Sequence, residues 1–390
     1  MSNVVIVAAR RTPMGGFQGS LSSVPASDLA AQSIRACIED TGLAPEQVSE
    51  VLMGCVLPAG QGQAPARQAT IKAGLDLSVG ATTVNKVCGS GMKTVMMAND
   101  LIKAGSADVV LAGGMESMSL APYLLDKARG GMRMGHGKVM DHMFLDGLED
   151  AYTGGAMGTF AQKTADDFGL TREQMDEYAL TSLQRANDAI NSGAFEAEIT
   201  PVTVKTRKGE HVISVDEQPG NARPEKIPQL RPAFAKDGTI TAANSSSISD
   251  GAASLILMSE EQAKAMNLDV LATIKGHATH AQKPEEFTIA PVGAVTKLME
   301  KVGWSADDVD LFEINEAFAM VTMLAISELG LHPEKVNVNG GACALGHPIG
   351  CSGARLLVTL IHALRRQGKS KGVASLCIGG GEATAMAIEV

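Results

Sequence analysis

The sequence is poor in aromatic residues and has no concentrated positive charge. Only 3% of its 390 residues are aromatic, and the formal net charge is -10 without any long block of lysine or arginine. This balance argues against nucleic acid as the main partner. No apolar run has the length that crosses a bilayer, so we expect no membrane partner either.

Paired cysteines and a leader segment are also missing. The six cysteines show no paired spacing, which argues against a disulfide framework and a zinc ribbon. The N-terminal residues enter a strand pattern at once and lack the features of a signal peptide. We therefore expect a cytoplasmic protein with reduced thiols. These are Cys37, Cys55, Cys88, Cys343, Cys351 and Cys377.

What the sequence does contain is an alternation of apolar strands and amphipathic helices. Strands are expected over 4–9, 51–56, 83–87 and 108–112, and helices over 27–40 and 89–105. Gly113 and Gly114 are expected to form a turn after the last of these strands. The alternation is typical of an α/β protein with a mostly parallel sheet covered by helices.

The last third of the chain repeats this unit. Residues 84–91 are echoed by 338–353, and residues 111–116 by 377–382. Because the matches occur in the same order at nearly constant separation, they indicate two copies of one α/β unit rather than a solenoid.

This repeat predicts three segments. An N-terminal half spans 1–118 and is completed by about 245–268, and a C-terminal half spans 269–390. Between them, 119–244 has a different composition, with one long helix expected over 171–192. We interpret 119–244 as an insertion that covers a site.

Cys88 is a candidate nucleophile because it lies between an apolar strand and the start of a predicted helix. The free N–H groups and the positive dipole end of a helix start favour the reactive thiolate. A single cysteine in an apolar segment is more often a small core residue, so the assignment depends on its partners.

Three further polar residues lie where partners would be expected. His347 is flanked by glycine and proline, which does not fit an apolar helix face. Cys377 ends an apolar strand just before Gly379, and the N–H groups of such a glycine turn can stabilise an oxyanion. Asn315 follows another strand, at the edge where open α/β sheets carry their sites.

This combination resembles the thiolase family, and the resemblance extends over the whole chain. The matching motifs are NKVCGSGMK, GGMESMS, NEAFA, NGGACALGHPIGCSGAR and CIGGGEA. The resemblance implies a duplicated α/β fold with two similar mixed-sheet halves, layered helix–sheet–helix–sheet–helix. It also implies that the insertion 119–244 is a loop domain over the site for coenzyme A (CoA).

The resemblance also implies a role for each candidate residue. Cys88 would take an acyl group as a thioester after His347 deprotonates it, and the backbone N–H groups of Cys88 and Gly379 would hold the oxyanion. Cys377 would be the acid/base at the α-carbon of the second substrate. His347 and a water on Asn315 would hold the oxygen of that substrate.

The implied reaction is the Claisen condensation of two acetyl-CoA to acetoacetyl-CoA and CoA, and the reverse thiolysis. The CoA thioesters are substrates, and no cofactor or metal is expected. Leu183 occupies the position where some potassium-activated relatives carry a tyrosine, so no bound cation is expected. The residues expected at the CoA and acyl group are Ser246, Arg223, Lys226, Met157 and Phe318.

Several alternatives stay open. The segments Ala156-Met157-Gly158 and Asn244-Ser245-Ser246-Ser247 depart from the commonest bacterial patterns, His-Met-Gly and Asn-Ala-Ser-Gly respectively, which leaves a broader-chain 3-ketoacyl-CoA thiolase of fatty-acid β-oxidation as an alternative. A ketosynthase-type enzyme shares the fold, but such enzymes use two histidines with the cysteine, whereas the second proton-transfer position here is Cys377. Two alternatives belong to other classes of protein. One is a zinc protein with Cys88, Cys377 and His347 as ligands, and the other is a non-catalytic CoA-binding protein. An uncovered edge strand is usually paired, and the resemblance implies a homo-oligomer, a dimer or tetramer.

Overall fold

A ten-stranded mixed sheet forms the centre of the molecule in the computed structural model, which describes residues 3–207 and 209–390. In spatial order the strands are β12 (Leu311–Ile314), β13 (Lys371–Ile378), β14 (Glu382–Glu389), β11 (Ala272–Ala281), β1 (Val4–Arg11), β10 (Ser249–Ser259), β5 (Val109–Ser117), β3 (Glu50–Gly54) and β4 (Gly80–Val84). The short strand β2 (Gly15–Gly16) pairs with β10.

The two ends of this sheet are built alike. In the N-terminal half β3 is parallel to β5, and β10 is antiparallel to both β5 and β1. In the C-terminal half β12 is parallel to β13, and β14 is antiparallel to both β13 and β11. Even β4, which pairs in parallel with β3, has a counterpart: Val336 forms a parallel bridge to Phe312 of β12. The strand pattern therefore shows the duplicated unit that the sequence repeat predicts.

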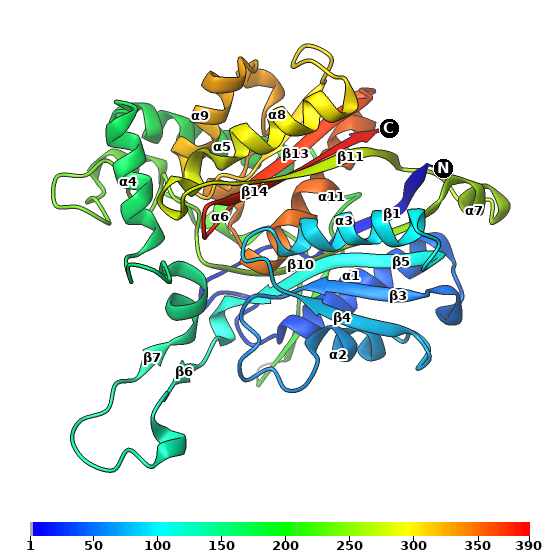
Figure 1. Ribbon diagram of the computed structural model, residues 1–390, viewed down its shortest axis with the longest axis horizontal. Coiled ribbons are helices and arrows are strands. Elements are labelled where there is room, and N and C mark those ends of the chain that lie inside the picture. The colour runs from blue at the N-terminus through cyan, green and yellow to red at the C-terminus, as the bar shows by residue number, and fades with distance from the viewer. Residues whose placement is uncertain (1–2, 208) are drawn as a thin grey trace.

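The two halves meet at β1 and β11, which pair at two positions, and helices form three layers around them. Helices α1 (Ala26–Thr41) and α2 (Pro65–Lys72) cover the outer face of the N-terminal half, while α8 (Ala290–Val302) and α9 (Ala319–Leu329) cover that of the C-terminal half (Figure 1). Between the halves, α3 (Ser90–Lys103) packs on α11 (Ile349–Gln367). The predicted order helix–sheet–helix–sheet–helix is confirmed.

Glycines allow the two central helices to touch backbone to backbone. A Cβ atom added to Gly91 would lie 2.8 Å from the nitrogen of Ala354, and one added to Gly353 would lie 2.4 Å from the nitrogen of Met92. Real Cβ atoms do not approach backbone so closely, so both positions require glycine. Because α3 and α11 begin just after Cys88 and His347, this contact brings those two residues to the boundary between the halves.

The insertion has its own elements and extends beyond the body of the molecule. Its hairpin of β6 (Tyr123–Leu124) and β7 (Met140–Asp141) projects from one corner (Figure 1). Further along are α4 (Met157–Asp167), α5 (Arg172–Asn191), β8 (Val202–Thr206), β9 (Gly209–Ile213) and α6 (Glu217–Asn221). The remaining short helices of the chain are η1 (Pro45–Gln47), η2 (Met118–Leu120), η3 (Ala128–Gly130), η4 (Phe144–Leu148), η5 (Pro224–Gln229), α7 (Glu260–Ala265), η6 (Pro284–Ile289), η7 (Pro333–Lys335) and α10 (Ala342–Leu345).

The long helix expected over 171–192 is confirmed as α5, and the chain begins it with a capping box. The Thr171 hydroxyl accepts a hydrogen bond from the backbone N–H of Gln174, whose side-chain oxygen accepts one from the backbone N–H of Thr171. Within residues 3–207 and 209–390, none of the helices combines the length and apolar character needed to cross a membrane.

The turn expected at Gly113 and Gly114 is wrong, because both residues lie inside β5. A Cβ on Gly113 would lie 2.1 Å from the carbonyl oxygen of Ala253, and one on Gly114 would lie 2.0 Å from that of Gly350. The glycines are needed for close approach of β10 and the start of α11, which the sequence pattern cannot distinguish from turn formation. The strand expected over 83–87 also ends early, at Val84, because the next residues turn out of the sheet.

Candidate active site

Cys88 follows a tight loop that joins β4 to α3. Val87 has a φ of +45°, which is strained for a β-branched residue. Two side chains hold this turn: Asn85 Oδ1 accepts the Val87 N–H at 2.9 Å, and Ser90 Oγ accepts the Lys86 N–H at 2.8 Å. The Ser90 hydroxyl also donates to the carbonyl of Val87 at 2.7 Å. The backbone that leads into Cys88 is therefore held in one conformation by its neighbours in sequence.

Apolar surroundings keep this thiol neutral. Burial raises the pKa of Cys88 to about 11, and hydrogen bonds from the backbones of Gly379 and Cys88 itself offset part of that rise. The expectation that the helix start favours a resting thiolate is wrong, because Cys88 packs against the apolar clusters of both halves. A neutral thiol in this position requires a base to become a nucleophile.

Cys377 and Gly379 reach the same place from the other half. Cys377 is fully buried in β13, opposite Ala383 of β14. Burial, and in addition the neighbouring Cys88, raise the pKa of Cys377 well above its usual range. A Cβ added to Gly379 would meet Met157 at 3.5 Å and Val87 at 3.6 Å. The structure thus brings Cys88, Cys377 and Gly379 together, as the sequence analysis expected.

His347 is buried, and its partners define its tautomer. Nδ1 lies 2.6 Å from the hydroxyl of Ser352, which itself donates its proton to the carbonyl of Pro348 at 2.9 Å. A hydroxyl has only one proton, so Nδ1 of His347 carries the hydrogen and donates it to Ser352. Nε2 is therefore unprotonated and free to act as a base, and it lies 3.4 Å from Nδ2 of Asn315.

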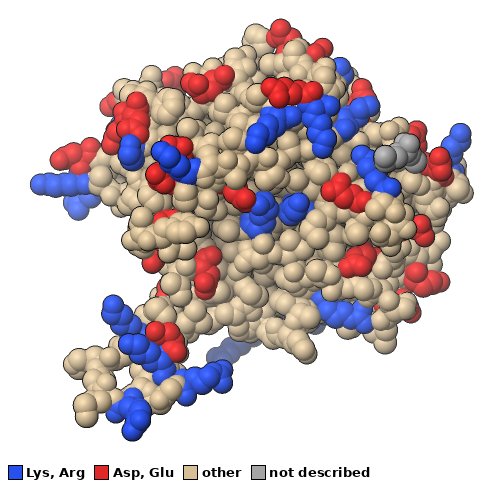
Figure 2. Space-filling view, in the orientation of Figure 1, with Lys and Arg blue, Asp and Glu red and all other residues tan. Residues whose placement is uncertain are grey.

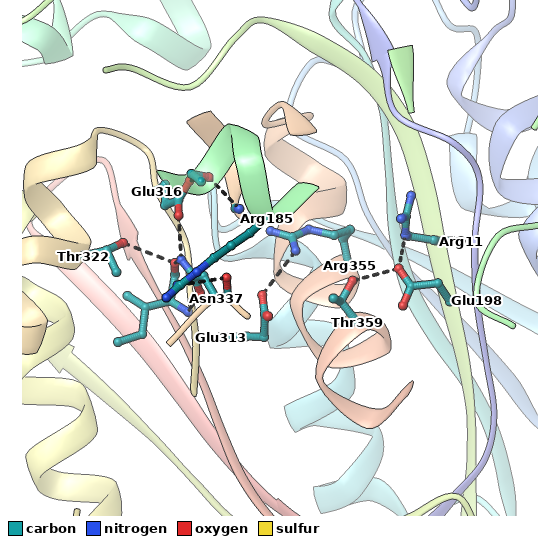
Figure 3. Close-up of polar contacts among 12 residues, drawn as sticks. Arg11, Arg185, Glu198, Glu313, Glu316, Thr322, Asn337, Arg355 and Thr359 are labelled. Atoms are coloured by element: carbon teal, nitrogen blue, oxygen red, sulfur yellow. Dashed lines mark hydrogen bonds and ion pairs between the residues drawn. The ribbon is translucent and has the colours of Figure 1, made fainter. Parts of the chain in front are cut away.

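The surroundings of His347 also favour the neutral ring. Burial, and in addition the cation of Arg355, lower the pKa of His347 to about 3. Arg355 forms a buried ion pair with Glu313 at 3.4 Å (Figure 3), which ties α11 to β12. In the described part of the chain no hydrogen bond joins His347 to Cys88. The Oδ1 atom of Asn315 is buried without a partner there, which leaves an acceptor for a water molecule.

Glu316 anchors the segment that carries Asn315. Its carboxylate accepts hydrogen bonds from Tyr178 at 3.0 Å, Ser182 at 2.8 Å, Asn337 at 2.9 Å and the backbone of Cys343 at 3.0 Å. Figure 3 shows Glu316 and Asn337 in this arrangement. Since Tyr178 and Ser182 belong to α5, the insertion is joined to the C-terminal half by satisfied polar contacts.

The basic residues expected at the CoA both line one cavity of about 350 Å³. Arg223 and Lys226 lie on its wall together with Ser247 and Leu183. Ser246 donates its hydroxyl to the carbonyl of Ala317 at 3.0 Å, so that Ser247 rather than Ser246 faces this cavity. The cavity has the positive charge that a CoA phosphate would need.

Met157 and Phe318 lie beside Cys377. Both belong to the apolar cluster that contains Cys377, and the ring of Phe318 meets that of Phe234 edge to face at 6.2 Å. These side chains surround the buried thiol with apolar groups and leave little polar surface next to it.

The sequence analysis missed Ser352 and Arg355. Ser352 is five residues after His347 at the start of a helix, and Arg355 is a single charge in an otherwise apolar stretch of α11. Both features are visible in the sequence, but only the fold shows that they face His347.

Zinc ligation by Cys88, Cys377 and His347 has no support from the geometry. Among residues 3–207 and 209–390, no group of three or more His, Cys, Asp and Glu side chains is arranged to hold a metal ion. The arrangement has instead a neutral thiol, a neutral imidazole and a second thiol around backbone N–H groups.

Comparison with known proteins decides the family. Residues 4–261 match the family model "Thiolase, N-terminal domain" and residues 268–390 match "Thiolase, C-terminal domain". The chain belongs to the thiolase family. The predicted thiolase resemblance is therefore confirmed over almost the whole chain.

This thiolase is similar to proteins with known names and structures. It is 51% identical over 390 residues to an acetyl-CoA acetyltransferase of Pseudomonas aeruginosa, with 100% of this chain and 99% of that protein covered. It superposes on the crystal structure of the Bacillus anthracis acetyl-CoA acetyltransferase with a TM-score of 0.97, at 44% identity and coverage of 100% and 99%. A thiolase from Ascaris suum in complex with coenzyme A gives a TM-score of 0.94, at 42% identity and 99% coverage of both chains.

Proposed function

We propose that this thiolase condenses two acetyl-CoA to acetoacetyl-CoA and CoA and catalyses the reverse thiolysis. The observation that carries the proposal is the meeting of Cys88 with Cys377 and Gly379 from the opposite half. His347, whose Nε2 is unprotonated, lies two residues before Ile349, which belongs to an apolar cluster that Cys88 also contacts. The names of the relatives and the CoA complex of one of them support the same substrates. They do not favour a broader-chain β-oxidation thiolase.

The first half-reaction acylates Cys88. Nε2 of His347 takes the thiol proton as the sulfur attacks the acetyl carbonyl, and the N–H groups of Cys88 and Gly379 stabilise the resulting oxyanion. When the tetrahedral intermediate collapses, the bond to the CoA sulfur breaks. Cys377 gives its proton to that sulfur, so CoA leaves as a thiol and Cys377 remains as a thiolate.

The second half-reaction forms the carbon–carbon bond. The Cys377 thiolate removes a proton from the methyl group of a second acetyl-CoA. The enolate oxygen is held by the protonated Nε2 of His347 and by a water on Asn315, whose Oδ1 has no partner among the described residues. The enolate carbon attacks the acetyl group on Cys88, and the expelled thiolate regains its proton from His347.

A thiolysis assay with C4, C6, C8 and C16 3-ketoacyl-CoA tests the proposed substrate. We expect kcat/KM to be highest for the C4 substrate and to fall by about tenfold or more by C8, because Met157 and Phe318 crowd the buried thiol. Comparable values for C4 and C16 would show a broader-chain thiolase instead.

Arg223 and Lys226 are proposed to contact the CoA phosphates. Changing both to alanine should raise the KM for CoA about tenfold while kcat stays within about twofold, because phosphate contacts are equal in the ground and transition states. The matched control is Lys205→Ala with Arg207→Ala, which removes two charges from the same insertion outside the cavity. Equal KM values in the two double variants would exclude Arg223 and Lys226 as phosphate contacts.

A homo-oligomer is proposed from two exposed features. Strand β4 is an edge of the sheet with accessible residues throughout, and edge strands are commonly paired. The projecting hairpin exposes Leu125, Met132, Met134 and Val139, and Figure 2 shows Lys and Arg side chains gathered on it. Light scattering in solution checks this proposal: a mass of 40.5 kDa would contradict it.

A cytoplasmic location is proposed on chemical grounds. The mechanism needs Cys88 and Cys377 as free thiols close to one another, and all six cysteines are unpaired. A reducing compartment keeps neighbouring thiols in that state. Cell fractionation with an antibody against the chain tests it, and recovery outside the cytoplasm would exclude the location.

A further inference from the structure

An ion pair joins the nucleophile loop to the opposite half of the molecule. Lys86, two residues before Cys88, contacts the carboxylate of Glu382 with its ammonium group. Glu382 begins β14 directly opposite Ile378 of β13, the residue before Gly379. The ion pair therefore connects the loop that carries the nucleophile to the turn that carries the N–H group of Gly379.

A second glutamate makes the reverse connection. Glu116 of β5, in the N-terminal half, accepts the backbone N–H of Gly350 at 2.9 Å. Gly350 lies three residues after His347, at the start of α11. The same carboxylate accepts the N–H groups of Val56 at 3.0 Å and Leu57 at 3.1 Å, so its position is fixed within its own half.

Glu116 and Glu382 occupy equivalent places in the duplicated unit. Both belong to the segments 111–116 and 377–382 that repeat in the sequence. Each therefore reaches across the boundary to the catalytic loop of the other copy. The resulting arrangement is reciprocal: Glu382 holds the loop of Cys88, and Glu116 holds the loop of His347.

We propose that Glu116 and Glu382, the latter through Lys86, are positioning residues that fix Cys88 and His347 relative to one another across the two halves. The inference rests on the proposed function, because it assigns these residues to the geometry of that reaction. They act through the two loops and do not themselves touch the reacting atoms.

The packing around the ion pair shows why such a contact is needed. A Cβ atom on Gly89 would lie 2.4 Å from Cδ1 of Ile378, so the two loops already touch at the residue after Cys88. The strained Val87 is held by partners on its own side, Asn85 and Ser90. Lys86 adds a charged contact to Glu382 of the other half, next to the turn that carries Gly379.

The Glu116 carboxylate is also built for a fixed position. It is fully buried, and burial raises its pKa to about 7, although three backbone N–H groups favour the charged form. Three N–H donors directed at one carboxylate restrict its position and its orientation. A glutamine in place of Glu116 would offer these three N–H donors only one oxygen acceptor.

The test removes the ion pair from each side. Lys86→Met and Glu382→Gln should each lower kcat for acetoacetyl-CoA thiolysis about ten- to hundredfold, with KM within about twofold, because the loops remain but their alignment changes. The double variant should be no slower than the slower single variant, since both changes break the same contact. Lys86→Arg, which keeps the charge, should recover most of the rate.

The matched control is Lys275→Met, which breaks the ion pair with Glu389 on strands β11 and β14 at 2.9 Å. It should leave kcat within about twofold of wild type. The rate of Cys88 alkylation by iodoacetamide should fall in Lys86→Met but not in Lys275→Met. Glu116→Gln tests the second connection, between Glu116 and the loop of His347, and should lower kcat without raising KM.

The outcomes separate the inference from the function on which it rests. A wild type that neither cleaves nor forms acetoacetyl-CoA would overturn the proposed function. An active wild type together with Lys86→Met and Glu382→Gln variants that match Lys275→Met in kcat and in labelling would overturn the inference. Reduced activity that is explained entirely by a smaller folded fraction, measured by circular dichroism, would overturn it as well.

Discussion

Replacing Cys88 by serine should leave a folded protein whose acetyl transfer is slower by about a thousandfold or more. A serine hydroxyl fits the site, but its higher pKa and lower polarizability make it a poor acyl carrier with a neutral His347 as its base. The measurement is kcat for acetoacetyl-CoA thiolysis, with circular dichroism to verify folding. Activity within tenfold of wild type would rule out Cys88 as the nucleophile.

Mass spectrometry identifies the acylated residue directly. After mixing wild type with acetoacetyl-CoA, the acetyl adduct should appear on the peptide that contains Cys88. The buried thiol of Cys37 provides an internal control and should remain unmodified. An adduct on Cys377 alone would reverse the roles assigned to the two thiols.

The pH dependence of this thiol follows from its surroundings. Because burial raises the pKa of Cys88 to about 11, its thiolate fraction below that pH rises about tenfold for each unit of pH. Alkylation of wild type by iodoacetamide should therefore accelerate steadily from pH 6 to pH 9. A plateau near neutral pH would instead show a thiolate stabilised in the resting enzyme.

The repeat in the sequence was enough to predict the duplicated α/β architecture, because each copy of the unit has local patterns that fold alike. The expected mostly parallel sheet is wrong: among the described strands of the main sheet, β3 with β4, β3 with β5 and β12 with β13 pair in parallel. The other pairs are antiparallel, because β10 and β14 run against both of their neighbours and β1 runs against β11. Strand β1 and helices α1, α3 and α5 agree with the expected segments within a few residues. The error at Gly113 and Gly114 has a clear origin. Glycines that permit close packing and glycines that permit a turn look the same in a sequence.

The candidate site could be predicted as a set of residues but not as a set of protonation states. Cys88, Cys377 and Gly379 meet as expected, since strand ends and glycine turns mark them. The neutral state of Cys88 depends on apolar side chains from both halves, and the tautomer of His347 depends on Ser352. Such contacts between distant segments leave no periodic signal in the chain.

The same reason explains why the roles of Glu116 and Glu382 could not be predicted from the sequence. Their equivalence in the repeat is visible in the sequence, but their partners lie in the opposite copy. Glu382 is 296 residues from Lys86, and Glu116 is 234 residues from Gly350. A duplicated fold thus places equivalent residues in reciprocal roles that neither copy shows alone.

The two thiols should be separable by the step that each one serves. Cys377→Ala should still acquire an acetyl group on Cys88 from acetyl-CoA, because a CoA thiolate can leave without a proton donor, but it should lose both condensation and thiolysis by about a thousandfold or more. His347→Ala should fail at labelling as well, since the neutral thiol of Cys88 then has no base. The measurements are the fraction of acetylated Cys88 and the steady-state rates.

Hydrogen exchange reports the α-proton step without any net reaction. Wild type incubated with acetyl-CoA in deuterated water should exchange deuterium into the acetyl methyl group, because Cys377 removes and returns its protons. Cys377→Ala should not exchange it, even though its Cys88 is acetylated. If that variant exchanges the methyl protons at the wild-type rate, Cys377 is not the base, and Nε2 of His347 is the remaining group at the site that can take the proton.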